Sequence, residues 1–210
     1  MSKIKVIVFD YDLTLYSVNE KYHNDFWVDY TAKLIEKLTE KMVQKNKEKF
    51  IEKYQLNKDR SVENFAKACN SEWGNCDALI QFMQTNYFEQ DYENMRFIQP
   101  NIVENLAKKY RLYIISNAPS NNIIRQLRDV AGINPNLFEG IYTNPHNIMD
   151  DSKGFVLKQI MRAENVESQE ILMLGDKMDV DILPAKKLGM NAELITDVDD
   201  ILIKINAFES

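Results

Sequence analysis

The order of apolar and polar positions divides the chain into three stretches. Near the start, the unbroken apolar run VIVF at residues 6–9 is typical of a strand buried on both faces of a parallel sheet. Residues 17–96 are rich in Lys, Glu, Asn, Gln and aromatic side chains and poor in β-branched runs, which predicts helices. From residue 97 onward, helical and strand patterns alternate. This order predicts a core that is interrupted, after its first strand, by a helical insertion.

The helical stretch carries its own start signal. The sequence SVNE at residues 17–20 matches a capping box, and aromatic or aliphatic side chains then recur at every fourth position over residues 22–42. We therefore expect a helix that begins at Ser17. Shorter helices are expected around residues 47–54, 62–69 and 77–88.

The alternating stretch predicts a parallel sheet, because parallel strands need crossover connections. The expected helices cover 100–109, 119–131, 152–164 and 181–188, and the expected strands cover 112–115, 140–143, 171–174 and 191–195. The fold class is therefore α/β, a Rossmann-like parallel sheet flanked by helices with an inserted α-helical cap. We expect residues 1–16 and 97–210 to form the core and residues 17–96 the cap domain.

Composition narrows the class of partner. Lys and Arg total 26 against 32 Asp and Glu, a net charge of −6 without a long basic run, so no nucleic acid polymer is expected. Cys69 and Cys76 lie in a segment without histidine, which fits neither a zinc site nor a disulfide framework. No apolar stretch reaches membrane-spanning length, and the N-terminus leads into a strand rather than a cleavable signal. We expect a cytoplasmic protein without a membrane partner.

Polar side chains follow three of the expected strands. Asp10 and Asp12 come after the first strand, Ser116 and Asn117 end the second, and Asp176 follows a later one. The carboxyl ends of parallel strands lie at one edge of the sheet, where ligands bind. These side chains are therefore candidates for one site. The alternative is that the two N-terminal aspartates only start a turn or cap a helix.

Further acids follow Asp176, and either Asp179 or Asp181 can join the same site. Crowded carboxylates repel one another unless a cation lies among them, and a set of oxygen ligands alone favours Mg²⁺. The sequence therefore predicts a magnesium site that includes Asp10.

These motifs resemble those of the haloacid dehalogenase superfamily, specifically its magnesium-dependent phosphohydrolases. The first motif is DYDLT at residues 10–14, the second is IISN at residues 114–117, the third is Lys153, and the fourth is GD at 175–176 with DI at 181–182. The resemblance covers residues 1–16 and about 97–210. It implies phosphoryl transfer in two steps with Mg²⁺ as the cofactor.

Roles for the first motif follow from the resemblance. Asp10 would attack phosphorus and become an aspartyl phosphate, and Asp12 would act as general acid and then as general base. Mg²⁺ would be bound by Asp10, Asp176 and the Asp12 backbone carbonyl. Thr14 would orient Asp12 and border the phosphate, or it is an ordinary hydroxyl at a helix start.

The second and third motifs would bind the phosphate. Ser116 and Asn117 stand where a strand leads into a helix, so a hydroxyl and backbone N–H groups can hold phosphate oxygens. The alternative for Ser116 is a plain N-cap. Lys153 would balance the negative charge. Many relatives have Lys-Pro in this loop and this chain has Lys-Gly, so Lys158 and then Lys177 are alternatives.

The remaining candidates would hold the catalytic residues in place or contact the substrate. Asp181 matches the family position and would order a metal-bound water or Lys153, whereas Asp179 is expected to face solvent or cap a helix. In the cap, Tyr16, Tyr22 and His23 are candidates for substrate contact, with packing inside the cap as the alternative for the aromatic residues.

The expected substrate is a small phosphorylated metabolite, such as a nucleoside monophosphate or a sugar phosphate. A phosphotransferase or phosphomutase of the same superfamily is an alternative, as is a catalytically silent fold used for binding. A dehalogenase needs only the nucleophile, so the presence of Asp12 and Asp176 argues against that activity.

Overall fold

The computed structural model describes residues 3–18, 95–118, 120–143 and 152–209. These residues belong to one compact unit of the chain, Met1–Val18 together with Asp91–Ser210. The helices expected beyond residue 18 in the insertion lie outside the described residues. The cap domain and its boundaries therefore stay a prediction.

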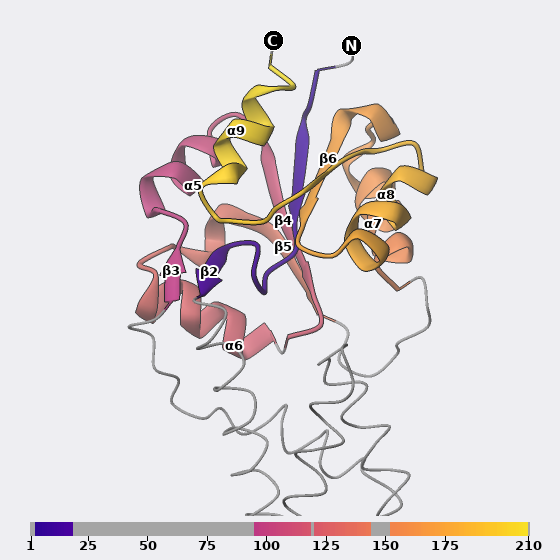
Figure 1. Ribbon diagram of the computed structural model, residues 1–210. Helices are drawn as coiled ribbons and strands as arrows, with labels where there is room; N and C mark the ends of the chain where they lie inside the picture. The colour runs from indigo at the N-terminus through magenta and orange to yellow at the C-terminus, as the bar shows by residue number, and fades with distance from the viewer. Residues whose placement is uncertain (1–2, 19–94, 119, 144–151, 210) are drawn as a thin grey trace, which may run out of the picture. The chain divides into compact units, whose positions relative to one another are not determined.

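The larger sheet of the described unit is parallel throughout (Figure 1). Its five strands are β1 (Val6–Phe9), β4 (Arg111–Ser116), β5 (Phe138–Thr143), β6 (Ile171–Gly175) and β7 (Asn191–Leu194), in the spatial order β5-β4-β1-β6-β7. The first strand of the sequence is therefore the central strand, flanked by β4 and β6. The predicted α/β fold class with a parallel sheet is confirmed.

Side chains of the central strand alternate between two hydrophobic clusters. Val6 and Val8 belong to one cluster, and Ile7 and Phe9 to the other. The first cluster includes side chains of α7 (Ser152–Glu164) and α8 (Leu183–Lys187), and the second those of α5 (Pro100–Ala107), α6 (Ser120–Arg125) and α9 (Asp200–Asn206). Helices thus cover both faces of the sheet, which explains the unbroken apolar run.

The helices follow the expected positions, with two irregular turns. The helix expected over 119–131 is α6 followed by a π-helical turn, Gln126–Val130, and the one expected over 181–188 is a π-helical turn, Met178–Ile182, followed by α8. Helix α9 was not expected from the sequence pattern. Among the helices of the described ranges, none is long and apolar enough to cross a membrane.

The chain enters and leaves the insertion through a short antiparallel ribbon. Its strands are β2 (Tyr16–Val18) and β3 (Met95–Phe97). The prediction that a helix begins at Ser17 is therefore wrong. Instead of capping a helix, the Ser17 hydroxyl accepts a hydrogen bond from the Val198 N–H at 2.8 Å, because the ribbon lies beside the loop before α9.

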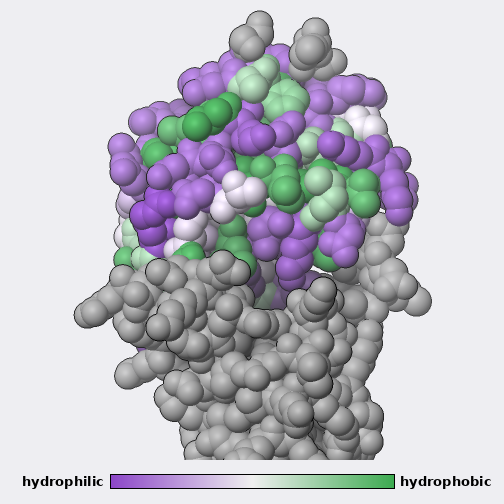
Figure 2. All heavy atoms as spheres, in the orientation of Figure 1, coloured by the Kyte–Doolittle hydropathy of each residue, from purple (hydrophilic) through white to green (hydrophobic). Residues whose placement is uncertain are grey.

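The described surface in Figure 2 is mostly hydrophilic with scattered apolar side chains. The large apolar side chains that the described unit exposes are Phe155, Met178, Val180, Leu183, Leu202 and Ile203. Four of these lie on α7, on α8 or in the turn that leads into α8, and two lie on α9.

Candidate active site

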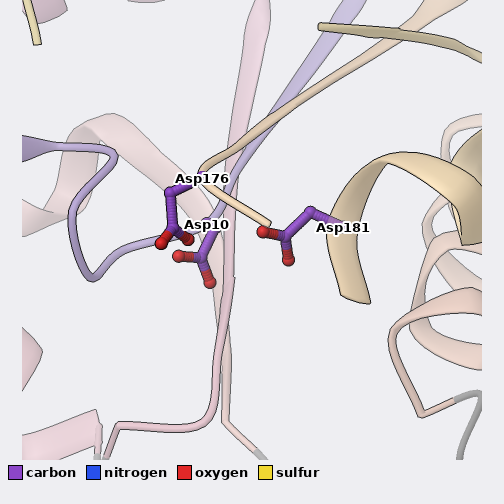
Figure 3. A group of neighbouring side chains, drawn as sticks. All are labelled: Asp10, Asp176 and Asp181. Carbon is purple, nitrogen blue, oxygen red and sulfur yellow. The ribbon is translucent and has the colours of Figure 1, made fainter. Parts of the chain in front are cut away.

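Polar side chains stand at the carboxyl ends of the three central strands. Asp10 directly follows β1, Ser116 is the last residue of β4, and Asp176 directly follows β6. The backbone N–H of Asp10 donates to the Leu174 carbonyl oxygen at 2.8 Å, so the β1–β6 pairing fixes the start of the loop. Figure 3 shows the carboxylates of Asp10, Asp176 and Asp181 turned toward one region.

A tight turn after Asp10 sets the direction of the next side chains. The Leu15 N–H donates to the Tyr11 carbonyl oxygen at 3.0 Å, and Leu13 lies in the left-handed region with a φ of +57°. Left-handed backbone is costly for a residue with a Cβ atom, and such conformations concentrate at functional sites. Thr14 is fully buried, and its hydroxyl has no hydrogen-bond partner among the described residues.

Asp12 is held by Tyr16 rather than by Thr14. The Tyr16 hydroxyl donates to Asp12 Oδ1 at 2.8 Å. Burial raises the pKa of Asp12, and the hydrogen bond from Tyr16 and the nearby lysines oppose that rise. Burial and the adjacent Asp12 hold the pKa of Tyr16 well above its ordinary range, so Tyr16 is the donor. The sequence pattern does not predict this contact; its only sequence signal is the spacing of four residues across a turn.

Lys153, near the start of α7, is the lysine that reaches the carboxylates. Its Nζ lies 2.5 Å from Asp10 Oδ1 and 2.5 Å from Asp181 Oδ1, and its side chain is 5% exposed. Burial disfavours the charged ammonium, but the two carboxylates outweigh burial and hold the pKa of Lys153 above its ordinary range. The alternatives, Lys158 and Lys177, are exposed. A fixed positive charge therefore lies beside Asp10.

Asp181 is completely buried and is the second carboxylate that binds the Lys153 ammonium. Its Oδ1 accepts from Lys153, and its Oδ2 accepts from the backbone N–H of Lys177 at 2.9 Å. Gly175 makes room for it, since a Cβ atom at position 175 would lie 2.4 Å from the Asp181 Cβ. The sequence predicts Gly175 as part of the fourth motif, but this steric requirement has no signal in the local pattern. Asp179 is exposed, as expected.

The three carboxylates form an acidic cluster, which is a candidate site for a divalent cation. Asp10, Asp176 and Asp181 each offer an oxygen, and these oxygens lie within 4.8 Å of one another. Burial raises the pKa of Asp10 to about 8, with Lys153 opposing burial and the neighbouring carboxylates adding to it. Burial and then Asp181 raise the pKa of Asp176 to about 6. A cation relieves such repulsion, and an all-oxygen donor set suits Mg²⁺.

The second motif forms a turn at the end of β4. Ser116 is buried, and its Oγ accepts from the Ala118 N–H at 3.0 Å, whereas Asn117 is exposed. The Ser116 hydroxyl proton can point toward a bound anion while the oxygen accepts this bond. Of the candidates for substrate contact, Tyr22 and His23 lie outside the described residues, and Tyr16 is buried and donates to Asp12.

Several solved structures share this fold. A haloacid dehalogenase-like family protein from Streptococcus pneumoniae is 17% identical with a TM-score of 0.63, and the match covers 100% of both chains. A HAD phosphatase from Thermococcus onnurineus is 16% identical with a TM-score of 0.60, over 96% of this chain and 98% of that one. A putative HAD-hydrolase from Bacillus subtilis bound to magnesium is 16% identical with a TM-score of 0.57, over 98% and 100%.

Sequence comparison gives a more specific result than these structural likenesses. A search of curated proteins returned no match. The family model of the haloacid dehalogenase-like hydrolases matches residues 4–189, which include every motif residue discussed above. By this match across most of its length, the chain belongs to the haloacid dehalogenase-like hydrolases.

Proposed function

We propose that the chain is a Mg²⁺-dependent phosphohydrolase that removes phosphate from a small phosphorylated metabolite through an aspartyl phosphate on Asp10. One observation carries the proposal. A buried carboxylate at the end of the central strand lies against a buried ammonium, that of Lys153, with Asp12 two residues further on. Nucleophile, charge balance and proton carrier are thus available together.

The residues present fit a magnesium ion. Asp10 and Asp176 would hold it together with the Asp12 backbone carbonyl, since Asp181 uses both carboxylate oxygens as acceptors for Lys153 and Lys177. When bound, Mg²⁺ neutralises negative charge on the phosphate and on its carboxylate ligands. A bound cation would favour the ionised form of Asp10 and so oppose the rise in pKa that burial causes.

The first step transfers the phosphoryl group to the protein. A carboxylate oxygen of Asp10 forms a bond to phosphorus while the ester P–O bond breaks. The proton of the Asp12 carboxyl group moves to the departing oxygen, so the product leaves as a neutral alcohol. Burial raises the pKa of Asp12, which favours the protonated acid that this step needs.

The second step returns the protein to its starting state. A water oxygen attacks phosphorus, the bond between phosphorus and the Asp10 oxygen breaks, and Asp12 takes the proton from the water. Throughout, Lys153 and the Ser116 hydroxyl would hold phosphate oxygens, with Asn117 and Thr14 at the border of the phosphate. Asp181 would keep the Lys153 ammonium in place.

Substrate choice belongs to the inserted segment in this proposal. Residues 17–96 would form the cap that covers the site, with Tyr22 and His23 as candidates for substrate contact. A sugar phosphate or a nucleoside monophosphate is the proposed class of substrate.

The test is phosphate release from a panel of sugar phosphates and nucleotides, with Mg²⁺ or with EDTA. We expect release by the wild type to require the metal, and Asp10→Asn to lower it on the order of a thousandfold or more, because the nucleophile is lost. Asp179→Asn is the matched control, since it makes the same change in an exposed acid that lies outside the motif residues. Release that survives Asp10→Asn would exclude the aspartyl phosphate.

A further inference from the structure

Tyr16 contacts the proton carrier of the proposed reaction directly. Its hydroxyl donates to Asp12 Oδ1 at 2.8 Å, which leaves the second carboxyl oxygen, Oδ2, to carry the transferred proton. We propose that Tyr16 is the positioning residue of the catalytic acid: it fixes the rotation of the Asp12 carboxyl group so that Oδ2 faces the departing oxygen. This inference rests on the proposed function, in which Asp12 exchanges a proton with the leaving group.

The Tyr16 ring is itself held firmly. Tyr16 is 8% exposed, its ring meets that of Tyr11 edge-on with centroids 5.6 Å apart, and it packs against Phe97 at 5.2 Å. Its backbone pairs with Phe97 in the β2–β3 ribbon. A carboxyl group otherwise rotates over a broad range about its last torsion. A donor on a ring packed on two sides removes that freedom.

Thr14, the other candidate for orienting Asp12, makes no contact of that kind in the described structure. Thr14, which was expected to orient Asp12, is fully buried and makes no hydrogen bond to a described residue. Lys153 and Lys177 act on Asp12 through their charge, whereas Tyr16 also donates a hydrogen bond to its carboxyl group. Tyr16 supplies the directional contact.

The role predicts a dependence on the leaving group. Phenols have a pKa of about 10. Phenolate is therefore a poor leaving group, and the hydrolysis of phenyl phosphate needs the proton from Asp12. Dinitrophenolate is a stable anion, and dinitrophenyl phosphate needs no proton. We expect Tyr16→Phe to lower kcat/KM for phenyl phosphate on the order of tenfold, and to leave kcat/KM for dinitrophenyl phosphate within about twofold, as expected where general acid catalysis contributes nothing.

The readout is the ratio of the two kcat/KM values from one preparation. A smaller folded fraction in the variant cancels from that ratio, so poor folding cannot imitate the result. Tyr11→Phe is the matched control, because it removes a hydroxyl from the other ring of the pair, and that hydroxyl donates to Gln126 at 2.6 Å. In an Asp12→Asn background, Tyr16→Phe should have no further effect on phenyl phosphate.

Two kinds of failure are distinguishable. Hydrolysis that depends on Asp10, with a ratio unchanged by Tyr16→Phe, would overturn the role of Tyr16 and leave the proposed function standing. The same ratio change in Tyr11→Phe would also overturn it, since the effect would then belong to the ring pair. Absence of any hydrolysis that depends on Asp10 would overturn the proposed function and this inference together.

Discussion

At the scale of single residues, the site depends on close approach as much as on charge. Asp181 reaches Lys153 because Gly175 has no side chain: a Cβ atom at position 175 would lie 2.4 Å from the Asp181 Cβ. The buried ammonium then balances two carboxylates. A buried charge that loses a partner is costly, so the three residues act as a unit.

Gly175→Ala tests this dependence. The new methyl group would meet Asp181 at 2.4 Å and push it away from Lys153. We expect the free energy of unfolding to fall by about 1 to 3 kcal/mol, as for other overpacked cores, together with a large loss of turnover. Denaturant unfolding and phosphate release measure the two effects. Gly140→Ala is the control, because its methyl group on β5 would meet ring atoms of Tyr142 on the same strand and of Tyr113 on β4, not Asp181.

At the scale of elements, the site is built from the ends of strands and one strained turn. The turn after β1 directs Asp12 and Thr14, and it requires Leu13 to adopt a φ of +57°. Leu13 also packs against the hydrophobic cluster around Phe9, which fixes its side chain. Local strain of this kind is tolerated when the surroundings determine the conformation.

Leu13→Val measures that strain. A β-branched side chain fits left-handed backbone poorly, so we expect a loss of stability of roughly 1 to 3 kcal/mol, the usual cost of a strained backbone site. Turnover should fall as Asp12 shifts. Leu13→Met keeps the unbranched Cβ and a similar volume, and it should cost much less. Equal losses in both variants would mean that packing, rather than backbone conformation, is what position 13 requires.

The sequence pattern predicts the long elements of the fold, but it does not predict the short ribbon or the contacts between distant residues. Buried apolar runs such as residues 6–9 predicted the parallel sheet, and the sheet in turn brings Asp10, Ser116 and Asp176 together at one edge. The three-residue strands β2 and β3 are too short to show a period, and the capping-box pattern at Ser17 predicts the start of a helix where β2 lies. The pocket that Gly175 leaves for Asp181 depends on tertiary contact, which no local pattern encodes.

At the scale of the whole molecule, metal binding, protonation and stability are linked. The folded state raises the pKa of Asp10 to about 8 and that of Asp176 to about 6, from an ordinary value of 3.8. The folded state therefore binds these protons more tightly than the unfolded state. Their contribution to stability is complete below pH 3.8 and is lost as the pH rises through about 6 and then about 8.

Magnesium should reverse that loss, because it binds the deprotonated carboxylates. We expect the rise in Tm on replacing EDTA with Mg²⁺ to be larger at pH 8 than at pH 6, because Asp10, with a pKa of about 8, is still mostly protonated at pH 6. At a hundredfold excess over Kd the gain is about 2.7 kcal/mol. Asp176→Asn should abolish most of the gain, and Asp179→Asn should not. A gain that is the same at both pH values would contradict the linkage.

The β2–β3 ribbon allows the length of the segment between its two strands to vary. Val18 and Met95 are paired opposite each other, so the backbone departs from the core and returns to it at neighbouring positions. The pairing of Val18 with Met95 holds the two ends of the intervening segment together. The entropic cost of closing that segment rises only slowly with its number of residues. If residues 17–96 set substrate choice, as proposed, exchanging the segment at this junction would change the substrate range and leave the residues of the site in place.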